Sequence, residues 1–210
     1  MQTNTEKRRR GRPPKEMTGH SETREALLNA GVAALTAKGF SATGIDEILR
    51  SVDVPKGSFY HYFKSKEAFG AQLIDRYAVY FTSKLDRILL NEARAPLQRM
   101  EDFVEDAVIG MQRFEFTRGC LVGNLGQEMG ALPPAYRNLL IDVFHTWQNR
   151  TATCLKAAVD MGEIHPDIDC DAAAEYFWIG WEGAVLRAKL EQSEAPLRQF
   201  MKGFLSGYAR

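Results

Sequence analysis

The sequence predicts an all-α protein of about nine helices, with a small N-terminal domain packed on a larger C-terminal one. Apolar residues recur at three- and four-residue spacing through most of the 210 residues, and no segment shows the alternation typical of a strand. Helical patterns begin beside Pro55, Pro96, Pro133, Pro134 and Pro196, where a missing N–H does least harm. A chain of this length can hold both domains.

The first two predicted helices lie between residues 21 and 52. The first follows Ser21, a candidate N-cap, and ends near Gly39; its apolar residues are Leu27, Leu28, Gly31, Leu35 and Phe40. The second follows Thr43, with Asp46 three residues later, a pattern close to a capping box. The short connection after it fits the turn of a helix-turn-helix motif.

A third, short helix is predicted between two start signals, Pro55 and Ser65. The stretch holds cations, hydroxyls and an imidazole, which bind phosphate oxygens and base edges, and no acid occurs before Glu67. We therefore predict that this helix binds double-stranded DNA. The predicted contact residues here are Thr43, Lys56, Gly57, Ser58, Tyr60, His61, Tyr62, Lys64 and Lys66.

These segments together resemble the DNA-binding domain of TetR-family transcriptional repressors, over about the first third of the chain. The resemblance implies a basic arm at 1–20, a helix-turn-helix domain at 21–66, and a ligand-binding and dimerisation domain at 67–210. It further implies a repressor that a small-molecule inducer releases from operator DNA. We expect no enzymatic activity, no cofactor and no metal site.

Positive charge is concentrated at the N-terminal end. The whole chain has 27 basic and 27 acidic residues, yet residues 1–66 hold twelve Lys and Arg against seven Asp and Glu. This bias favours phosphate attraction and salt-sensitive DNA binding.

We expect the N-terminal arm, residues 1–20, to be disordered in the free protein. Its run from Arg10 through Arg12 to Pro13 resembles an AT-hook, which enters the minor groove; a solvated basic tail is the alternative.

No apolar run approaches the roughly 20 residues that span a bilayer, and no apolar stretch follows the basic N-terminus as in a secretory signal. The three cysteines, Cys120, Cys154 and Cys170, lack CxxC spacing and are interpreted as reduced thiols. We therefore expect a cytoplasmic protein with no membrane partner.

Six further helices are predicted, at residues 66–91, 96–111, 121–129, 133–158, 171–191 and 196–208. The last two are the candidates for a homodimer interface, through an apolar stripe and small residues that allow close helix approach. The residues concerned are Gly180, Gly183, Ala184, Leu197, Phe200 and Phe204. Packing against the chain's own core is the alternative. The family resemblance implies pairing, and two copies are needed to reach successive major grooves.

Cys120 is the main candidate for a regulatory residue. It follows Gly119, lies two positions from Arg118 and precedes a predicted helix, conditions that lower a thiol pKa; a small buried apolar residue is the alternative. Residues 119–126 and Lys189 resemble TetR-family repressors that answer reactive electrophiles, and more narrowly the acrylate-responsive repressors of dimethylsulfoniopropionate breakdown. That resemblance implies a cysteine sensor at Cys120 with Lys189 nearby. A cation favoured in the last helical turn is the alternative for Lys189.

Other residues are predicted to shape a ligand pocket. Large aromatic side chains can wall it and polar ones can bind a ligand's polar group; the residues are Asn124, Glu128, His145, Trp147, Trp178 and Trp181. Plain core packing is the alternative for the tryptophans. Three rival functions are a repressor with a noncovalent apolar ligand, an enzyme that uses Cys120 with His145, and an architectural DNA-binding protein.

Overall fold

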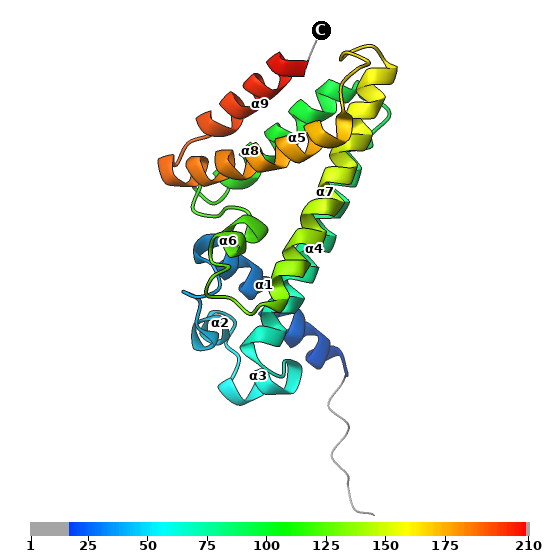
Figure 1. The fold of residues 1–210 in the computed structure, drawn as a ribbon. Coiled ribbons are helices and arrows are strands. Elements are labelled where there is room, and N and C mark those ends of the chain that lie inside the picture. The colour runs from blue at the N-terminus through cyan, green and yellow to red at the C-terminus, as the bar shows by residue number, and fades with distance from the viewer. Residues whose placement is uncertain (1–16, 209–210) are drawn as a thin grey trace, which may run out of the picture.

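The computed structural model describes residues 17–208, and these form nine helices and no strand (Figure 1). In chain order they are α1 Met17–Lys38, α2 Ile45–Ser51, α3 Lys56–Tyr62, α4 Lys66–Leu89, α5 Pro96–Gln112, α6 Leu121–Gln127, α7 Ala135–Asp160, α8 Cys170–Glu191 and α9 Ala195–Tyr208. The all-α prediction is confirmed. Within the described range, no helix is both long enough and apolar enough to cross a bilayer.

Helices α1, α2 and α3 form a small domain at one end of the molecule (Figure 1). Phe59 of α3 packs against Phe63 and Phe69 with ring centroids 5.2 and 5.3 Å away, and all three rings are buried. Because α3 turns this apolar side inward, its other side is left for solvent. The helix begins directly after Pro55, whose extended backbone precedes the first turn.

Two predicted N-caps are wrong. Helix α1 begins at Met17, so Ser21 lies inside it. At α2 the N-cap position belongs to Gly44, and the Thr43 hydroxyl instead donates a 2.6 Å hydrogen bond to the carbonyl of Gly39. A threonine hydroxyl can bond back to an earlier carbonyl as well as forward to an N–H, so the sequence pattern does not separate the two.

Helices α4 and α7 run side by side along the molecule and join the small domain to the opposite end (Figure 1). Helix α4 starts as predicted, because the Ser65 side chain accepts a 3.0 Å hydrogen bond from the backbone N–H of Ala68. Helix α7 starts directly after Pro134 and ends before Gly162, whose φ of +74° suits glycine.

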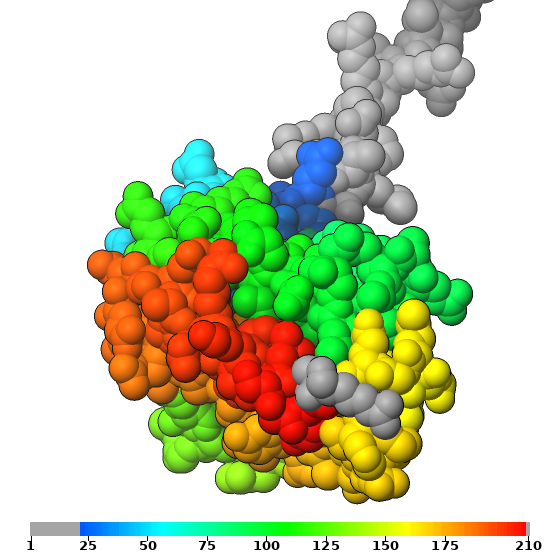
Figure 2. Space-filling view, turned by 90° about the horizontal axis from the view of Figure 1, so that it is seen from above, coloured from blue at the N-terminus to red at the C-terminus, as the bar shows by residue number. Residues whose placement is uncertain are grey.

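The far end of the molecule is built from α5, α8 and α9 around an aromatic core. Trp178 lies 4.9 Å from Trp147 and 5.9 Å from Phe103 between ring centroids, and all three are buried. Figure 2 shows this end, where α9 and part of α8 lie side by side on the surface. Gly180 makes that packing possible, since a Cβ there would lie 2.2 Å from the ring of Phe200.

Candidate functional site

The predicted DNA-contacting residues of α3 lie mostly on its outer side, at the tip of the small domain (Figure 1). Tyr60 is 59% exposed although it is aromatic. The other exposed residues of the set are Lys56, Gly57, His61 and Lys64, and the half-buried ones are Ser58 and Tyr62. This surface offers cations, hydroxyls and an imidazole for phosphate and base edges.

Two other predicted DNA contacts, Thr43 and Lys66, instead bind backbone groups of the same chain, which corrects their assignment. Thr43 is only 1% exposed and is bonded to Gly39. Lys66 donates a 2.9 Å hydrogen bond from Nζ to the carbonyl of Phe40 and lies 4.5 Å from the centroid of that ring. Burial lowers the pKa of the Lys66 ammonium, and Glu128 partly offsets this. Both side chains therefore hold the small domain together.

The remaining predicted contacts are less constrained. Lys56 forms an ion pair of 3.0 Å with Asp46, and both side chains are well exposed. An exposed pair of this kind contributes little and can exchange for a phosphate. Arg10 and Arg12 of the AT-hook-like run lie outside the described residues.

A cavity of about 280 Å³ has Cys120 in its wall, among residues of α1, α4, α5 and α8. Phe81, Phe103 and Trp181 give it aromatic walls. Its polar residues include Lys84, Asp106, Arg118 and Glu182. A mostly apolar cavity with a few convergent polar groups suits a small organic molecule with one polar end.

The charged groups of this cavity are not equivalent. Lys84 is paired with Asp106 at 2.6 Å in a largely buried position. Arg118 lies with its guanidinium carbon 3.9 Å from the centroid of Phe114 and has no carboxylate partner among the described residues. Arg113 also lines the cavity without a carboxylate partner among the described residues, so these two guanidinium groups are the cations able to bind a ligand's carboxylate.

Cys120 is 8% exposed and occupies the N-cap position of α6, where its sulfur accepts from the N–H of Gly123 at 3.4 Å. The prediction of a lowered thiol pKa is wrong. Burial raises the pKa of Cys120 well above its usual range, and the Glu182 carboxylate raises it further, although the Gly123 N–H acts in the opposite direction. The helix N-terminus lowers the pKa of the thiol, but desolvation and Glu182, which lies 62 positions later in the sequence, raise it by more.

Glu182 was not among the residues predicted from the sequence. Burial raises the pKa of its carboxyl to about 7, and the neighbouring Cys120 thiol acts in the opposite direction. Oε1 is buried and has no hydrogen-bond partner within the described part of the chain. Tyr77 of α4 lines the same cavity, and its pKa is raised by burial and further by Cys120 and Glu182, so three titratable side chains lie together here.

The last turn of α1 is held by residues next to Cys120. The Gly119 N–H donates to the carbonyl of Thr36 at 2.9 Å, and the Asn124 amide donates to the carbonyls of Leu35 and Thr36 at 2.9 Å each. Lys189 of α8 donates from Nζ to the carbonyl of Ala37 at 2.6 Å. Carbonyls that end a helix lack intrahelical partners, so these donors cap α1.

Glu128 holds the segment that follows. Its Oε1 and Oε2 accept hydrogen bonds from the N–H groups of Phe40 and Ser41 at 3.0 and 2.7 Å. The carboxylate lies against Gly39, where a Cβ would be 1.6 Å from Oε1. The connection from α1 to the helix-turn-helix is thus fixed by side chains of the larger domain.

These contacts correct several predicted ligand residues. Asn124, Glu128 and Lys189 are engaged with backbone groups, and the gap that Asn124 and Lys189 share with Cys120 has a volume of only about 10 Å³. Trp181 lines the Cys120 cavity as predicted. Trp147 and Trp178 do not, and belong to the core; Trp178 donates from Nε1 to the Thr151 hydroxyl at 3.0 Å.

His145 lines a separate surface pocket, which it shares with Glu182. It is not among the residues around Cys120, so the two do not form a nucleophile and base pair in this structure.

The predicted dimer residues are mostly turned inward. Leu197, Phe204 and Ala184 are buried in the chain's own core, and Gly180 is covered by Phe200, which is half-buried. Only Gly183 of the set is exposed. The apolar residues that α8 does expose are Tyr176, Ile179, Leu186 and Leu190, at three- and four-residue steps with Gly183 among them. The candidate interface on α8 is therefore this exposed stripe, which keeps Gly183 from the predicted set.

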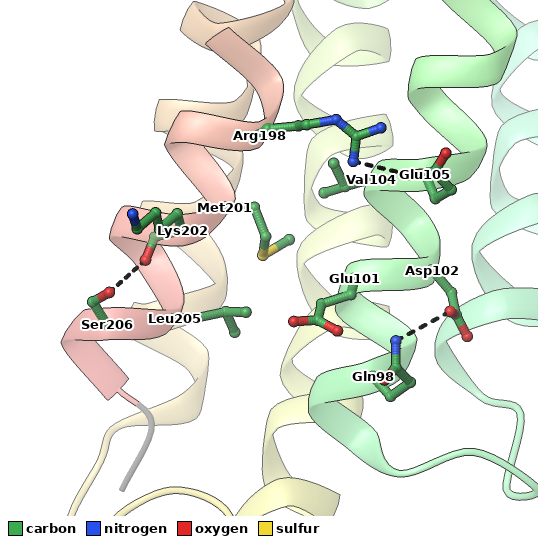
Figure 3. A pocket seen from close by; sticks show the side chains of 10 residues that line it. All are labelled: Gln98, Glu101, Asp102, Val104, Glu105, Arg198, Met201, Lys202, Leu205 and Ser206. Carbon is green, nitrogen blue, oxygen red and sulfur yellow. Dashed lines mark hydrogen bonds and ion pairs between the residues drawn. The ribbon is translucent and has the colours of Figure 1, made fainter. Parts of the chain in front are cut away.

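A larger groove of about 710 Å³ lies between α5 and α9 and is distinct from the Cys120 cavity (Figure 3). Arg198 reaches across it to Glu105 with a 2.9 Å ion pair. Glu101 and Lys202 add opposite charges on its two sides. The groove has no cysteine and no aromatic side chain in its walls, so it lacks the features that mark the Cys120 cavity.

Comparison with known families matches both parts of the chain. Residues 27–73 match the profile of bacterial regulatory proteins of the tetR family. Residues 96–204 match the tetracyclin repressor-like C-terminal domain.

Individual proteins similar to this chain are also transcriptional regulators. The chain is 52% identical over 202 residues to the transcriptional regulator AcuR of Cereibacter sphaeroides, covering 95% of this chain and 90% of that protein. It is 30% identical to the transcriptional repressor NemR of Escherichia coli K12, covering 86% and 92%. It is 29% identical to the repressor DhaR of Mycobacterium sp. GP1, covering 85% and 88%.

Solved structures of such regulators share the fold of this chain. The crystal structure of a regulatory protein TetR from Rhodobacter sphaeroides has a TM-score of 0.86 at 52% identity, covering 88% of this chain and 98% of that one. The reduced form of E. coli NemR has a TM-score of 0.78 at 26% identity, covering 90% and 97%.

Proposed function

The chain belongs to the TetR family of bacterial transcriptional regulators, and we propose that it is a repressor released from its operator when a small electrophile such as acrylate reaches Cys120. It binds DNA through α3 and its neighbouring turns, and its larger domain carries the ligand site. We expect it to act in the cytoplasm, where its operator is.

The observation that carries the proposal is the position of Cys120. Its side chain lines the cavity, and Gly119 and Asn124 on either side of it hold the last turn of α1. An adduct on the sulfur would fill space beside that turn and displace the start of α6. Because packed elements shift between discrete arrangements, such a displacement can reorient the attached helix-turn-helix.

The class of inducer follows from the cavity. Acrylate is small for a space of about 280 Å³, so larger α,β-unsaturated carbonyl compounds also fit. Arg118 supports a ligand with a carboxylate, while the aromatic walls support an apolar remainder. The chemical class is therefore an α,β-unsaturated acid or carbonyl compound.

A homodimer supplies the second DNA-reading helix. The exposed stripe of α8 around Gly183 is the part of the surface best suited to pair with a second copy, because it is apolar and flanks a small residue. In a dimer the two α3 helices must reach major grooves roughly 34–36 Å apart. A change in α1 orientation would alter that separation and weaken operator binding.

The test is operator-fragment binding at fixed salt by the native protein and by Cys120→Ser, each with and without acrylate. We expect acrylate to release the native protein but not the variant. Cys170→Ser serves as the matched control, because Cys170 is also buried yet lies outside the cavity, and it should respond like the native protein. Release of both the native protein and Cys120→Ser would contradict the covalent part of the proposal.

A noncovalent apolar ligand is the second candidate, and two observations favour it. The cavity has aromatic walls, and burial keeps the pKa of the Cys120 thiol high, so that little thiolate is present beforehand. In that case Cys120→Ser would stay fully inducible by the true ligand.

A further inference from the structure

We propose that Glu182 is the proton acceptor for Cys120, so that the two side chains act as a dyad when the thiol adds to an α,β-unsaturated compound. This inference rests on the proposed function of the Cys120 cavity. It assigns a role to a carboxyl group that the DNA-binding function does not use.

The geometry around the sulfur supports the dyad. Oε2 of Glu182 lies against the backbone of Gly123, whose N–H donates to the Cys120 sulfur at 3.4 Å, and each of the two side chains shifts the pKa of the other. Cys120, Glu182 and Tyr77 all line the one cavity. A ligand in the cavity therefore meets the nucleophile and the neighbouring carboxylate together.

The carboxylate is held in place rather than mobile. A Cβ at Gly123 would lie 1.9 Å from Oε2, so the carboxylate packs directly on the glycine backbone of the first turn of α6. Oε1 is buried without a partner among the described residues. Burying an acceptor without a donor costs folding free energy. Here the acceptor lies beside the cavity, where it can take up a proton or accept a hydrogen bond from a ligand.

No other described residue fits the role as well. The Lys189 ammonium already donates to the Ala37 carbonyl, and a guanidinium such as that of Arg118 has no lone pair to accept a proton. His145 shares a pocket with Glu182 but does not line the cavity. The charged and titratable side chains that share a cavity or pocket with Glu182 are Tyr77, Tyr80, Lys84, Asp106, Arg113, Arg118, Cys120, His145 and Lys189.

Charge balance explains why a buried thiol can react here. Burial raises the pKa of Cys120, and it also raises the pKa of Glu182 to about 7. The site carries one negative charge whether the proton lies on sulfur or on the carboxylate. Moving the proton from sulfur to Glu182 therefore relocates a buried charge and does not create a second one.

The reaction needs no further reagent. As the sulfur forms a bond to the β-carbon of the acceptor, the thiol proton passes to the Glu182 carboxylate. The π electrons move toward the carbonyl and give an enolate, and the proton then passes from Glu182 to the α-carbon. The sum is addition of S–H across the double bond, with Glu182 returned as carboxylate.

The test measures the rate of Cys120 alkylation by acrylamide, a neutral probe, in the full chain without DNA, by quenching and peptide mass mapping. General-base catalysis predicts that Glu182→Gln slows alkylation at pH 7 by about 10²-fold. Removing a negative neighbour without a catalytic role would instead ease thiol ionisation and speed the reaction. An equal or faster rate in Glu182→Gln therefore overturns the dyad.

Controls separate catalysis from damage to the fold. Glu175→Gln changes an exposed acid on the same helix and should leave the rate of Cys120 alkylation unchanged. The rate of Cys170 alkylation should be the same in every variant. Glu182→Asp keeps a carboxylate and should recover part of the rate. The native rate should level off above pH 7, near the Glu182 pKa, whereas in Glu182→Gln it should keep rising with thiol ionisation.

Operator binding measured in the same samples distinguishes the dyad from the proposed function. Alkylation that depends on Glu182 while the operator stays bound supports the dyad and contradicts induction through Cys120. A native Cys120 that reacts no faster than Cys170 overturns the dyad, and acrylate release in the same samples would then point to a noncovalent ligand.

Discussion

Lys189 of α8 donates a hydrogen bond of 2.6 Å to the backbone carbonyl of Ala37, at the end of α1 and 152 residues earlier in the chain. It links the sensor part of the molecule directly to the helix that carries the helix-turn-helix. Burial lowers the pKa of this ammonium, because removing it from water disfavours its charged form.

We expect Lys189→Met to weaken the link between the two domains. Substitutions within a coupling network typically change the coupling free energy by about 0.5–2 kcal/mol. Inducer should therefore change operator affinity less in the variant than in the native protein, as measured by titration with and without acrylate. Lys202→Met, at an exposed position on α9, is the control. Unchanged coupling in Lys189→Met would show that the hydrogen bond is only structural.

Gly39→Ala should destabilise the fold strongly. Gly39 has φ +81°, and a Cβ there would meet the Glu128 carboxylate at 1.6 Å. The left-handed backbone costs about 1–2 kcal/mol for a non-glycine residue, and displacing Glu128 breaks two charge-assisted hydrogen bonds, so we expect a loss of roughly 2–4 kcal/mol.

Urea denaturation would measure that loss. Gly44→Ala is the matched control, because its φ is −89° and no atom lies within 4 Å of the added carbon. It should cost less than about 1 kcal/mol. Equal losses in the two variants would contradict the role given to the Glu128 contact.

Arg118→Gln should separate charged from neutral inducers. A charge-assisted hydrogen bond contributes about 1.5–3 kcal/mol, so loss of the guanidinium should weaken the response to acrylate by roughly tenfold or more. The response to acrylamide, which has no carboxylate, should change little. The measurement is the inducer concentration that gives half release of an operator fragment. Parallel losses for both compounds would assign Arg118 to cavity shape instead.

The stability of the protein should depend on pH through Glu182. Burial raises the pKa of this carboxyl from 4.5 to about 7, so the folded state keeps a proton that the unfolded chain releases between these values. The stabilisation is full below pH 4.5 and is lost as the pH rises through 7. The loss amounts to about 3 kcal/mol in the unfolding free energy.

Glu182→Gln removes this titration. Urea denaturation at pH 5 and pH 8 should therefore show a smaller decrease for the variant than for the native protein. Glu175→Gln, exposed on the same helix, should follow the native protein. Identical decreases in all three proteins would place the Glu182 pKa near its usual value.

The fold was predictable because its start and stop signals are local. Pro96 begins α5, Pro134 directly precedes α7, Ser65 caps α4, and Gly39 follows α1, each through a physical effect that acts within one helical turn. Ser21 failed as a cap because α1 continues on its N-terminal side, which no single residue reveals.

The site was less predictable because its chemistry depends on long-range contacts. Cys120 was identified from its neighbours in sequence, yet its pKa is set by burial and by Glu182, which lies on another helix. Most of the predicted dimer residues are buried in the chain's own core, and this was hard to foresee because α8 is apolar nearly all round: Phe177 and Trp181 are buried while Ile179 and Leu190 are exposed. Periodicity alone cannot tell such faces apart.

The donors that hold the last turn of α1 bind its carbonyl oxygens and none of its side chains. These hydrogen bonds do not depend on which side chains the turn carries, although Leu35, Thr36 and Phe40 are also buried and a glycine must follow the turn to admit Glu128. A chimera spliced at this turn, with Leu35, Thr36, Gly39 and Phe40 kept, should therefore retain the inducer response while adopting a new target sequence.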